Sequence, residues 1–265
     1  MIKDSVLSIL LRYTNSQYKK DSNYDLAWML LKYYNDIPDM TINELADKCY
    51  VSSSTLSRFT KNIGFESFLE FKEACRNTLK IMDTDYSLAV SKAKKEDIQP
   101  IFSRYTKHVI DNIQFVYDHL DYHQLDRITQ KMNESENIAM LGMEFSTLLG
   151  QHFQNRLALV NKYVKIGLTY DDQLNIVETI NGPAVVFIAS IEGGYFYRND
   201  EIMKKLLSKN NIYIVVLTMN LQNKLIKEAN EVVLCSKENS DTEGRISLLY
   251  IIELIIMYYC INYSH

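Results

Sequence analysis

The sequence predicts two domains of different class, an all-α N-terminal domain and an α/β C-terminal domain. Residues 1–80 show apolar side chains at helical spacing and contain no convincing strand. Between residues 137 and 235, short β-rich runs alternate with helical segments. Such alternation is typical of βαβ units, and it predicts a parallel sheet with helices on both faces.

The expected domain boundaries follow from this change of pattern. Residues 1–80 form the helical domain, the polar and charged segment 81–105 forms a linker, and residues 106–265 form the α/β domain. Five strands are expected, at 137–141, 163–166, 184–189, 212–217 and 231–235. A last helix over 246–261 is apolar nearly all round, which favours burial against the sheet or in a subunit interface.

Charge and cysteine content exclude several classes of protein. The net charge of −4 excludes a protein that coats nucleic acid by bulk charge. Residues 1–80 nevertheless carry 11 Lys and Arg against 10 Asp and Glu, so a local DNA-binding surface remains open. The four cysteines form no C-x-x-C pair, and we expect no disulfide framework, metal site or cofactor.

No targeting or membrane segment is expected. The N-terminus lacks a long apolar core and a small-residue cleavage site, so it is a poor secretory signal. The most apolar stretch, 248–261, is shorter than the about 20 residues of a membrane span. We therefore expect a cytoplasmic protein that does not bind a membrane.

The most informative segment runs from Thr41 to Phe65. Thr41 and Glu44 have the spacing of a capping box at a helix start. One apolar stripe follows, and its members are Ile42, Leu45, Ala46 and Cys49. Ser52 can cap a second helix, which Gly64 would end. The inward face of this second helix consists of Leu56, Phe59 and Ile63. Two short helices joined by a tight turn predict a helix-turn-helix.

The outward face of the second helix carries the side chains that could bind DNA. Arg58 and Lys61 can reach phosphates or guanine edges, and short hydroxyls allow a close approach to the groove. Ser52 and Ser53 at the helix start could donate to a phosphate. The expected DNA-binding residues are Ser52, Ser53, Ser54, Thr55, Ser57, Arg58 and Lys61. The alternative is a solvated helix face in an unrelated small bundle.

The run from Thr41 to Phe71, with ELA, VSSSTLSRF and GFESFLEFK, resembles the helix-turn-helix of the RpiR family of bacterial regulators. In that family this domain precedes a SIS (sugar isomerase) domain that senses phosphosugars. The resemblance implies a transcriptional regulator of carbohydrate metabolism, with a double-stranded DNA operator and a sugar or sugar-phosphate effector as partners. It also implies a homodimer or tetramer without enzymatic activity. Tyr50 departs from the family's small turn residue, and a left-handed conformation there would cost about 1–2 kcal/mol.

Two loops are expected to form the effector site, because ligands of open parallel sheets bind beyond the carboxyl ends of the strands. The first spans 142–146 and the second 190–195. The resemblance implies S-x-S-G-x-T in the second loop, where Glu192 and Tyr195 replace the second serine and the threonine. It also implies a Ser–Arg pair near the start of the last helix, where Leu249 and Tyr250 stand. The expected effector-binding residues are Gly142, Ser146, Ser190, Glu192, Gly193 and Tyr195.

Three readings of this effector site remain open. The acidic Glu144 and Glu192 could accept hydrogen bonds from a non-phosphorylated or cationic sugar, the fold could serve dimerisation alone, or phosphosugar binding could be intact. From another class, a sugar-phosphate isomerase-like enzyme with a helical appendage is the alternative, followed by a pure interaction scaffold. No catalytic residue is predicted, because the candidates Glu144, His152, Glu192 and Glu243 have no diagnostic spacing.

Overall fold

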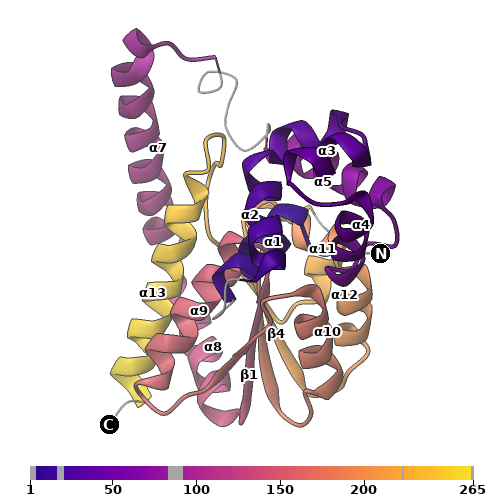
Figure 1. Cartoon of the computed structure of the whole chain (residues 1–265). Helices are drawn as coiled ribbons and strands as arrows, with labels where there is room; N and C mark the ends of the chain where they lie inside the picture. The colour runs from indigo at the N-terminus through magenta and orange to yellow at the C-terminus, as the bar shows by residue number, and fades with distance from the viewer. Residues whose placement is uncertain (1–3, 17–20, 83–91, 223, 264–265) are drawn as a thin grey trace. The chain divides into compact units, whose positions relative to one another are not determined.

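A computed structural model describes residues 4–16, 21–82, 92–222 and 224–263 (Figure 1). The chain divides into two compact units, residues 1–86 and residues 87–265. Of the predicted linker 81–105, residues 83–91 lie outside the described residues.

The N-terminal unit is helical throughout its described residues, as predicted. Its elements in chain order are α1 (Val6–Ser16), α2 (Ser22–Lys32), η1 (Tyr34–Asp39), α3 (Ile42–Lys48), α4 (Ser53–Asn62) and α5 (Phe68–Met82). Each helix contributes apolar side chains to one core, which contains the fully buried Leu10, Leu30, Leu45, Phe59 and Phe71. This shared core fixes α3 and α4 against the rest of the unit.

The C-terminal unit is built on the predicted parallel sheet of five strands. The strands are β1 (Asn137–Gly142), β2 (Val164–Ile166), β3 (Ala184–Ala189), β4 (Ile212–Thr218) and β5 (Glu231–Leu234). They lie in the order β2-β1-β3-β4-β5, and every pair is parallel. Each predicted strand end agrees with the structure to within one residue. All six residues of the central β3 are buried, because helices cover both faces of the sheet.

Two helical layers cover the sheet (Figure 1). One core joins one face to α8 (Tyr122–Glu134), α9 (Phe145–Ala158) and α13 (Gly244–Tyr263). The second core joins the other face to α10 (Tyr170–Thr179), α11 (Gly194–Arg198) and α12 (Asp200–Leu207). The remaining elements are η2 (Lys95–Asp97), α7 (Ile98–Asp118) and η3 (Lys224–Glu228). The architecture is the predicted α/β class with a helical N-terminal domain.

Two helices begin before the boundaries that the sequence indicated. α7 begins at Ile98, inside the predicted linker, and its first turn accommodates Pro100 because amides of the first turn have no intrahelical partner. α13 begins at Gly244 and has 20 residues, so by length and composition it could cross a membrane. Its residues Leu248, Ile251, Ile252 and Ile255 are buried in the core beside the sheet, which is what the core helix of an α/β domain requires.

Candidate functional site: the α4 face and the strand-end loops

The first helix of the motif has the predicted cap. The Thr41 hydroxyl accepts from the Glu44 amide at 3.3 Å, and the Glu44 carboxylate accepts from the Thr41 amide at 2.7 Å. These hydrogen bonds satisfy two of the amides that a helix start leaves free. Hydrogen bonds from the Thr41 amide and hydroxyl hold the pKa of the exposed Glu44 below its ordinary value.

The turn between α3 and α4 contains Tyr50 in a left-handed conformation, with φ of 56°. Its side chain is 88% exposed and gains no burial in return for the strain. The turn geometry is therefore kept despite the unfavourable residue, because Leu45, Ala46 and Phe59 on either side are buried in one core.

The predicted faces of α4 are present. Leu56 and Phe59 are buried, whereas Ser54, Arg58 and Lys61 are exposed. Ser57 and Thr55 are half-buried. Among the described residues, neither Arg58 nor Lys61 forms an ion pair. Two cations one turn apart on α4 are thus not paired with a carboxylate among the described residues.

A cluster of hydroxyls occupies the start of α4. The Ser52 hydroxyl accepts from the Thr55 amide at 3.1 Å and lies 2.8 Å from the Ser54 hydroxyl. Ser53 donates to the Asn43 side chain of α3 at 2.6 Å. The hydroxyls therefore fix the helix start and its contact with α3, and Ser52 and Ser54 remain exposed beside the positive end of the helix dipole.

The two predicted effector loops flank the point where the strand order reverses. β1 lies between β2 and β3. The chain therefore adds β2 on one side of β1 and the later strands on its other side. Ligands of open α/β sheets bind at this point, beyond the carboxyl ends of the strands. The loops 142–146 and 190–195, here called the first and second strand-end loops, follow β1 and β3 and therefore lie at the expected edge of the sheet.

The first loop is tight and strained. A Cβ on Gly142 would lie 2.5 Å from the Ser146 Cβ, so the loop requires a glycine there. Ser146 itself is buried, at 8% exposure. Glu144 has φ of 49° and ψ of −108°, a conformation that favours glycine and costs about 1–3 kcal/mol in other residues. Its side chain is exposed and makes no cap for α9.

The second loop is held by its own hydrogen bonds. The Ser190 hydroxyl accepts from the Tyr195 amide at 3.0 Å, and Gly193 is left-handed with φ of 83°. The Tyr195 side chain is fully buried, donates to the Gln173 amide oxygen at 2.8 Å and has a pKa far above its ordinary value because of burial. The structure places this tyrosine ring in the core, where it supports the loop from behind.

The Gln173 side chain connects the two loops, which sequence reasoning missed. It lies on α10, and its Nε2 donates to the Gly142 carbonyl at 2.7 Å and to the Gly167 carbonyl at 3.2 Å. With the Tyr195 bond, both ends of this buried amide are used. A polar residue on a largely apolar helix face was the available signal.

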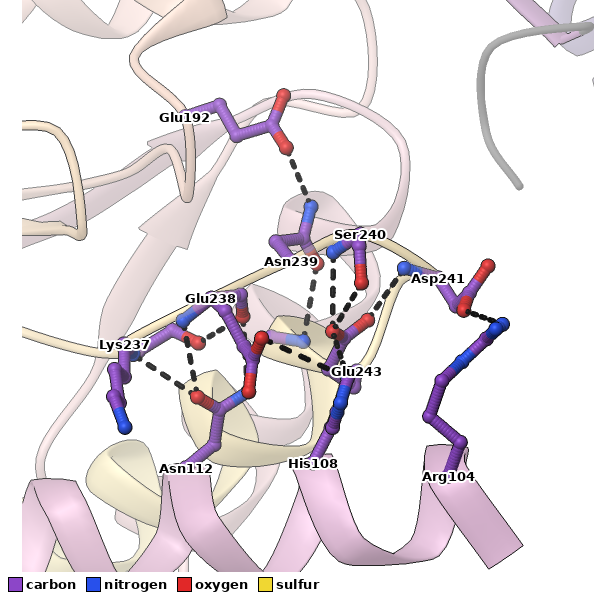
Figure 2. A network of polar contacts seen from close by, with 12 residues as sticks. Arg104, His108, Asn112, Glu192, Lys237, Glu238, Asn239, Ser240, Asp241 and Glu243 are labelled. Atoms are coloured by element: carbon purple, nitrogen blue, oxygen red, sulfur yellow. Dashed lines mark hydrogen bonds and ion pairs between the residues drawn. The ribbon is translucent and has the colours of Figure 1, made fainter. Parts of the chain in front are cut away.

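The Glu192 side chain reaches the segment between β5 and α13 (Figure 2). Its Oε1 accepts from Asn239 Nδ2 at 2.8 Å, and Asn239 lies between β5 and α13. Its backbone carbonyl accepts from Asn220 at 3.0 Å. From the sequence we expect Glu192 to bind the effector. In the structure its carboxylate is hydrogen-bonded to Asn239, 47 positions later in the chain.

An arginine stands at the start of the last helix, contrary to the prediction of Leu249 and Tyr250. α13 begins two residues earlier than predicted, so Gly244 and Arg245 occupy its first turn. The Arg245 guanidinium carbon lies 5.7 Å from the centre of the Phe145 ring, at the start of α9. A cation thus adjoins the first strand-end loop, where the sequence had indicated no positive charge.

Three metal-ligating side chains approach one another outside these loops. The ligand atoms of His108, Glu238 and Glu243 lie within 4.8 Å of each other. Glu243 already accepts from the Ser240 amide and hydroxyl, both at 3.0 Å, and from the Asp241 amide at 2.6 Å. Burial would raise the pKa of Glu243, but these amide bonds outweigh burial and keep it below its ordinary value. The carboxylate oxygens are therefore occupied by protein donors, which favours a structural anchor.

The helix-turn-helix unit matches a known family. Residues 9–80 match the family model of the helix-turn-helix domain of the rpiR family. The chain carries the rpiR-family helix-turn-helix domain. A curated relative, an HTH-type transcriptional regulator of Providencia stuartii, is 26% identical over 214 residues, which cover 81% of this chain and 75% of the relative. The chain is thus similar over most of its length to a protein described as an HTH-type transcriptional regulator.

One solved structure shares the fold over nearly the whole chain, and another shares the fold of the C-terminal unit. NanR of Vibrio vulnificus, solved in complex with ManNAc-6P, is 16% identical, covers 96% of this chain and 92% of its own, and has a TM-score of 0.55. The sugar isomerase domain of an RpiR transcription factor from Sphaerobacter thermophilus is 10% identical, with a TM-score of 0.54 over 61% of this chain and 90% of its own. The C-terminal unit has the sugar isomerase fold that the sequence resemblance implied.

Proposed function

We propose that this protein binds an operator through α4 and responds to a sugar or sugar phosphate at the two strand-end loops. One observation carries the proposal: Arg58 and Lys61 are exposed on the face of α4 that lies opposite the buried Leu56 and Phe59. A helix with this arrangement can enter a major groove while its apolar face stays in its own core. In this proposal the protein acts in the cytoplasm, where it can bind genomic DNA.

Each predicted DNA-binding residue has a distinct role in this proposal. Arg58 reads a base edge or clamps a phosphate, and Lys61 contacts a phosphate one turn further along α4. Ser52 and Ser54 donate to the backbone at the helix start, as Thr55 and Ser57 do from the half-buried flank. Ser53 holds α3 and α4 together through Asn43.

The C-terminal unit supplies the pairing that a palindromic operator requires. Several apolar side chains of α7, α9 and α13 are exposed in the single chain: Phe102, Ile110, Leu148, Met257 and Ile261. Exposed apolar groups on adjacent helices are typical of a subunit contact. A homodimer then presents two α4 helices to half-sites about 34 Å, or a multiple of it, apart.

The effector is proposed to bind beyond β1 and β3. Gly142, Ser146, Ser190 and Gly193 shape the two loops, and Arg245 adds positive charge beside the first. The Glu192 carboxylate accepts a hydrogen bond from Asn239, so it already has a partner within the protein. The positive charge of Arg245 favours a phosphosugar over a cationic sugar, in line with the phosphosugar bound by the structurally similar NanR.

An isomerase-like enzyme remains the second candidate because of one pair of side chains. His152 Nε2 of α9 contacts the Glu253 carboxylate of α13 in a groove of about 630 Å³. Both side chains are partly exposed, at 39% and 33%, as an acid–base pair requires. Turnover of an aldose/ketose phosphate pair that is abolished by His152→Gln would establish this activity.

Genomic DNA capture tests the proposal. The full chain is incubated with fragmented genomic DNA, and recovered fragments are sequenced and assayed by fluorescence anisotropy. We expect a recurring inverted repeat, with binding that weakens steeply as salt rises because phosphate contacts release counterions. Recovery of random fragments, or of none at low salt, would reject the operator-binding function.

A further inference from the structure

The segment 236–243, here called the β5–α13 loop, contacts the second strand-end loop on one side (Figure 2). Asn239 Nδ2 donates to Glu192 Oε1 at 2.8 Å, and Asn239 Oδ1 accepts from the Gly244 amide at 3.0 Å. Both ends of the side-chain amide are used, which fixes its orientation. A Cβ on Gly244 would lie 2.8 Å from Asn239 Oδ1, so the first residue of α13 must be a glycine for this packing.

On its other side the β5–α13 loop is bound to α7 through Asn112. This side chain is fully buried. Its Oδ1 accepts from the Lys237 and Glu238 amides at 3.0 and 3.1 Å, and its Nδ2 donates to the Glu238 carbonyl at 2.9 Å. Three backbone groups of the loop therefore depend on one residue of α7.

Two further residues of α7 extend this contact towards the start of the helix. Arg104 donates to Asp241 Oδ2 at 2.7 Å, and the Asp241 side chain is only 3% exposed. His108 Nδ1 lies 3.4 Å from Glu243 Oε1 and 3.7 Å from Glu238 Oε2. Arg104, His108 and Asn112 are four residues apart, so they lie on one face of α7, as Figure 2 shows.

The first half of α7 depends on these polar contacts. The buried residues of α7 are Asn112 and Val116, both in its second half. Apolar side chains near the start, such as Phe102 at 66% exposure, do not pack into the core of their own chain. Within that chain the polar contacts are therefore what holds this segment, so its position is sensitive to the loop that it contacts.

We propose that the β5–α13 loop is the coupling element that transmits occupancy of the loop 190–195 to α7, with Asn239 as its positioning residue. The proposal rests on the proposed effector site. A ligand that displaces Glu192 breaks the contact with Asn239 and loosens the loop from Arg104, His108 and Asn112. α7 follows the N-terminal unit in the chain, so its release changes how that unit is presented. The two states are the β5–α13 loop bound to α7 and the loop released from it. The ligand can shift this equilibrium only by the difference in its affinity for the two states.

Hydrogen–deuterium exchange on the full chain without ligand tests the coupling. Asn239→Asp keeps the acceptor for Gly244 but places a carboxylate against Glu192. We expect the amides of α7 between 98 and 112, which Asn239 does not contact, to exchange about five- to ten-fold faster, the change that loss of about one net hydrogen bond gives. Lys237→Ala is the matched control, because Lys237 uses only its backbone amide in the network and its side chain is exposed.

The second arm measures regulation directly. Operator binding is titrated with ManNAc-6P and with glucose 6-phosphate as probes, for the wild type, Asn239→Asp and Asn112→Ala. We expect both variants to bind operator and probe while the probe-induced change in operator Kd falls by about five-fold or more, the lower range of allosteric coupling.

The two arms separate failure of this inference from failure of the proposed function. Unchanged α7 exchange in Asn239→Asp, with the wild-type response to the probe retained, overturns the coupling element. If no probe binds the wild type, the effector site is wrong, and the exchange experiment alone decides whether the β5–α13 loop couples Glu192 to α7. If Asn112→Ala unfolds, Asn239→Asp still tests the coupling, because Asn239 is only partly buried.

Discussion

The α4 face and the strand-end loops differ in how their polar groups are used. On α4, Arg58 and Lys61 have no ion-pair partner among the described residues. At the loops, Ser190, Tyr195 and Glu192 are each hydrogen-bonded within the protein. A surface with free cations is ready to bind a polyanion at once, whereas a ligand at the loops must exchange one set of contacts for another. That exchange is what a switch requires.

The largest effect is expected from a core residue beneath α4. Phe59 is buried and packs edge-on against Tyr13, with ring centres 5.5 Å apart. Phe59→Ala should destabilise the N-terminal unit by about 3–5 kcal/mol, because the aromatic packing disappears and a cavity remains. Calorimetry should show the N-terminal transition shifted and the C-terminal one unmoved. A common shift of both would show that the two units do not unfold separately.

Acid should destabilise the C-terminal unit through a carboxylate in its sheet. Glu231 in β5 is buried, and its carboxylate accepts from Arg127 and Tyr213 at 2.6 and 2.8 Å. Burial would raise its pKa, but these donors keep it below the ordinary value of 4.5. Its contribution is thus full above about pH 4.5 and is lost as pH falls through the folded pKa.

Glu231→Gln is the variant that isolates this contribution. We expect a loss of about 1–3 kcal/mol at neutral pH, the range for hydrogen bonds to charged groups, and a smaller further loss on acidification than in the wild type. Urea unfolding followed between pH 7 and pH 3 provides the measurement. Parallel losses in the two proteins would assign the acid sensitivity to other groups.

Glu192→Ser tests whether the hydrogen bond between Glu192 and Asn239 limits ligand binding at the strand-end loops. The substitution removes the contact with Asn239 and a negative charge near the proposed anion site, worth about 1 kcal/mol at surface-like dielectric. Affinity for a phosphosugar, measured by calorimetry, should rise about five-fold while the response of operator binding falls. Glu136→Ser, at an exposed position before β1, is the control for loss of charge alone. No gain across a phosphosugar panel would favour a unit that serves dimerisation.

The smallest effect is expected in the turn of the DNA-binding motif. Tyr50 has φ of 56° and is 88% exposed, so Tyr50→Gly removes strain without removing packing. The added flexibility of the unfolded chain offsets part of this gain, and we expect a net stabilisation of about 0.5–1 kcal/mol. Thermal unfolding checks it. A destabilised variant would show that the added flexibility of the unfolded chain outweighs the strain at this position.

The elements that follow local rules were predictable from the sequence. Thr41 with Glu44 indicated the start of α3, and the apolar spacing of Leu56 and Phe59 indicated the orientation of α4. The alternation of strands and helices predicted the sheet, including both strand-end loops. These features depend on residues close together in the chain, where spacing alone carries the information.

The hydrogen bonds that close the strand-end loops were not predictable in the same way. Glu192 with Asn239, and Tyr195 with Gln173, join residues that are 47 and 22 positions apart. Such pairs arise from the packing of loops at one edge of the sheet and leave no periodic pattern. The left-handed Glu144 and the position of Arg245 were missed for the same reason, because neighbouring elements impose them.

Operator binding by an Arg58→Ala, Lys61→Ala double variant tests the central claim most directly. The account predicts that binding to the captured operator weakens by about 1–3 kcal/mol for each side chain that reads a base, and that the salt slope decreases by about one unit for each side chain that binds a phosphate. Lys32→Ala on α2 removes a positive charge elsewhere in the N-terminal unit and should change neither quantity. Unaltered affinity and salt slope in the double variant would contradict the assignment of α4 as the DNA-reading helix.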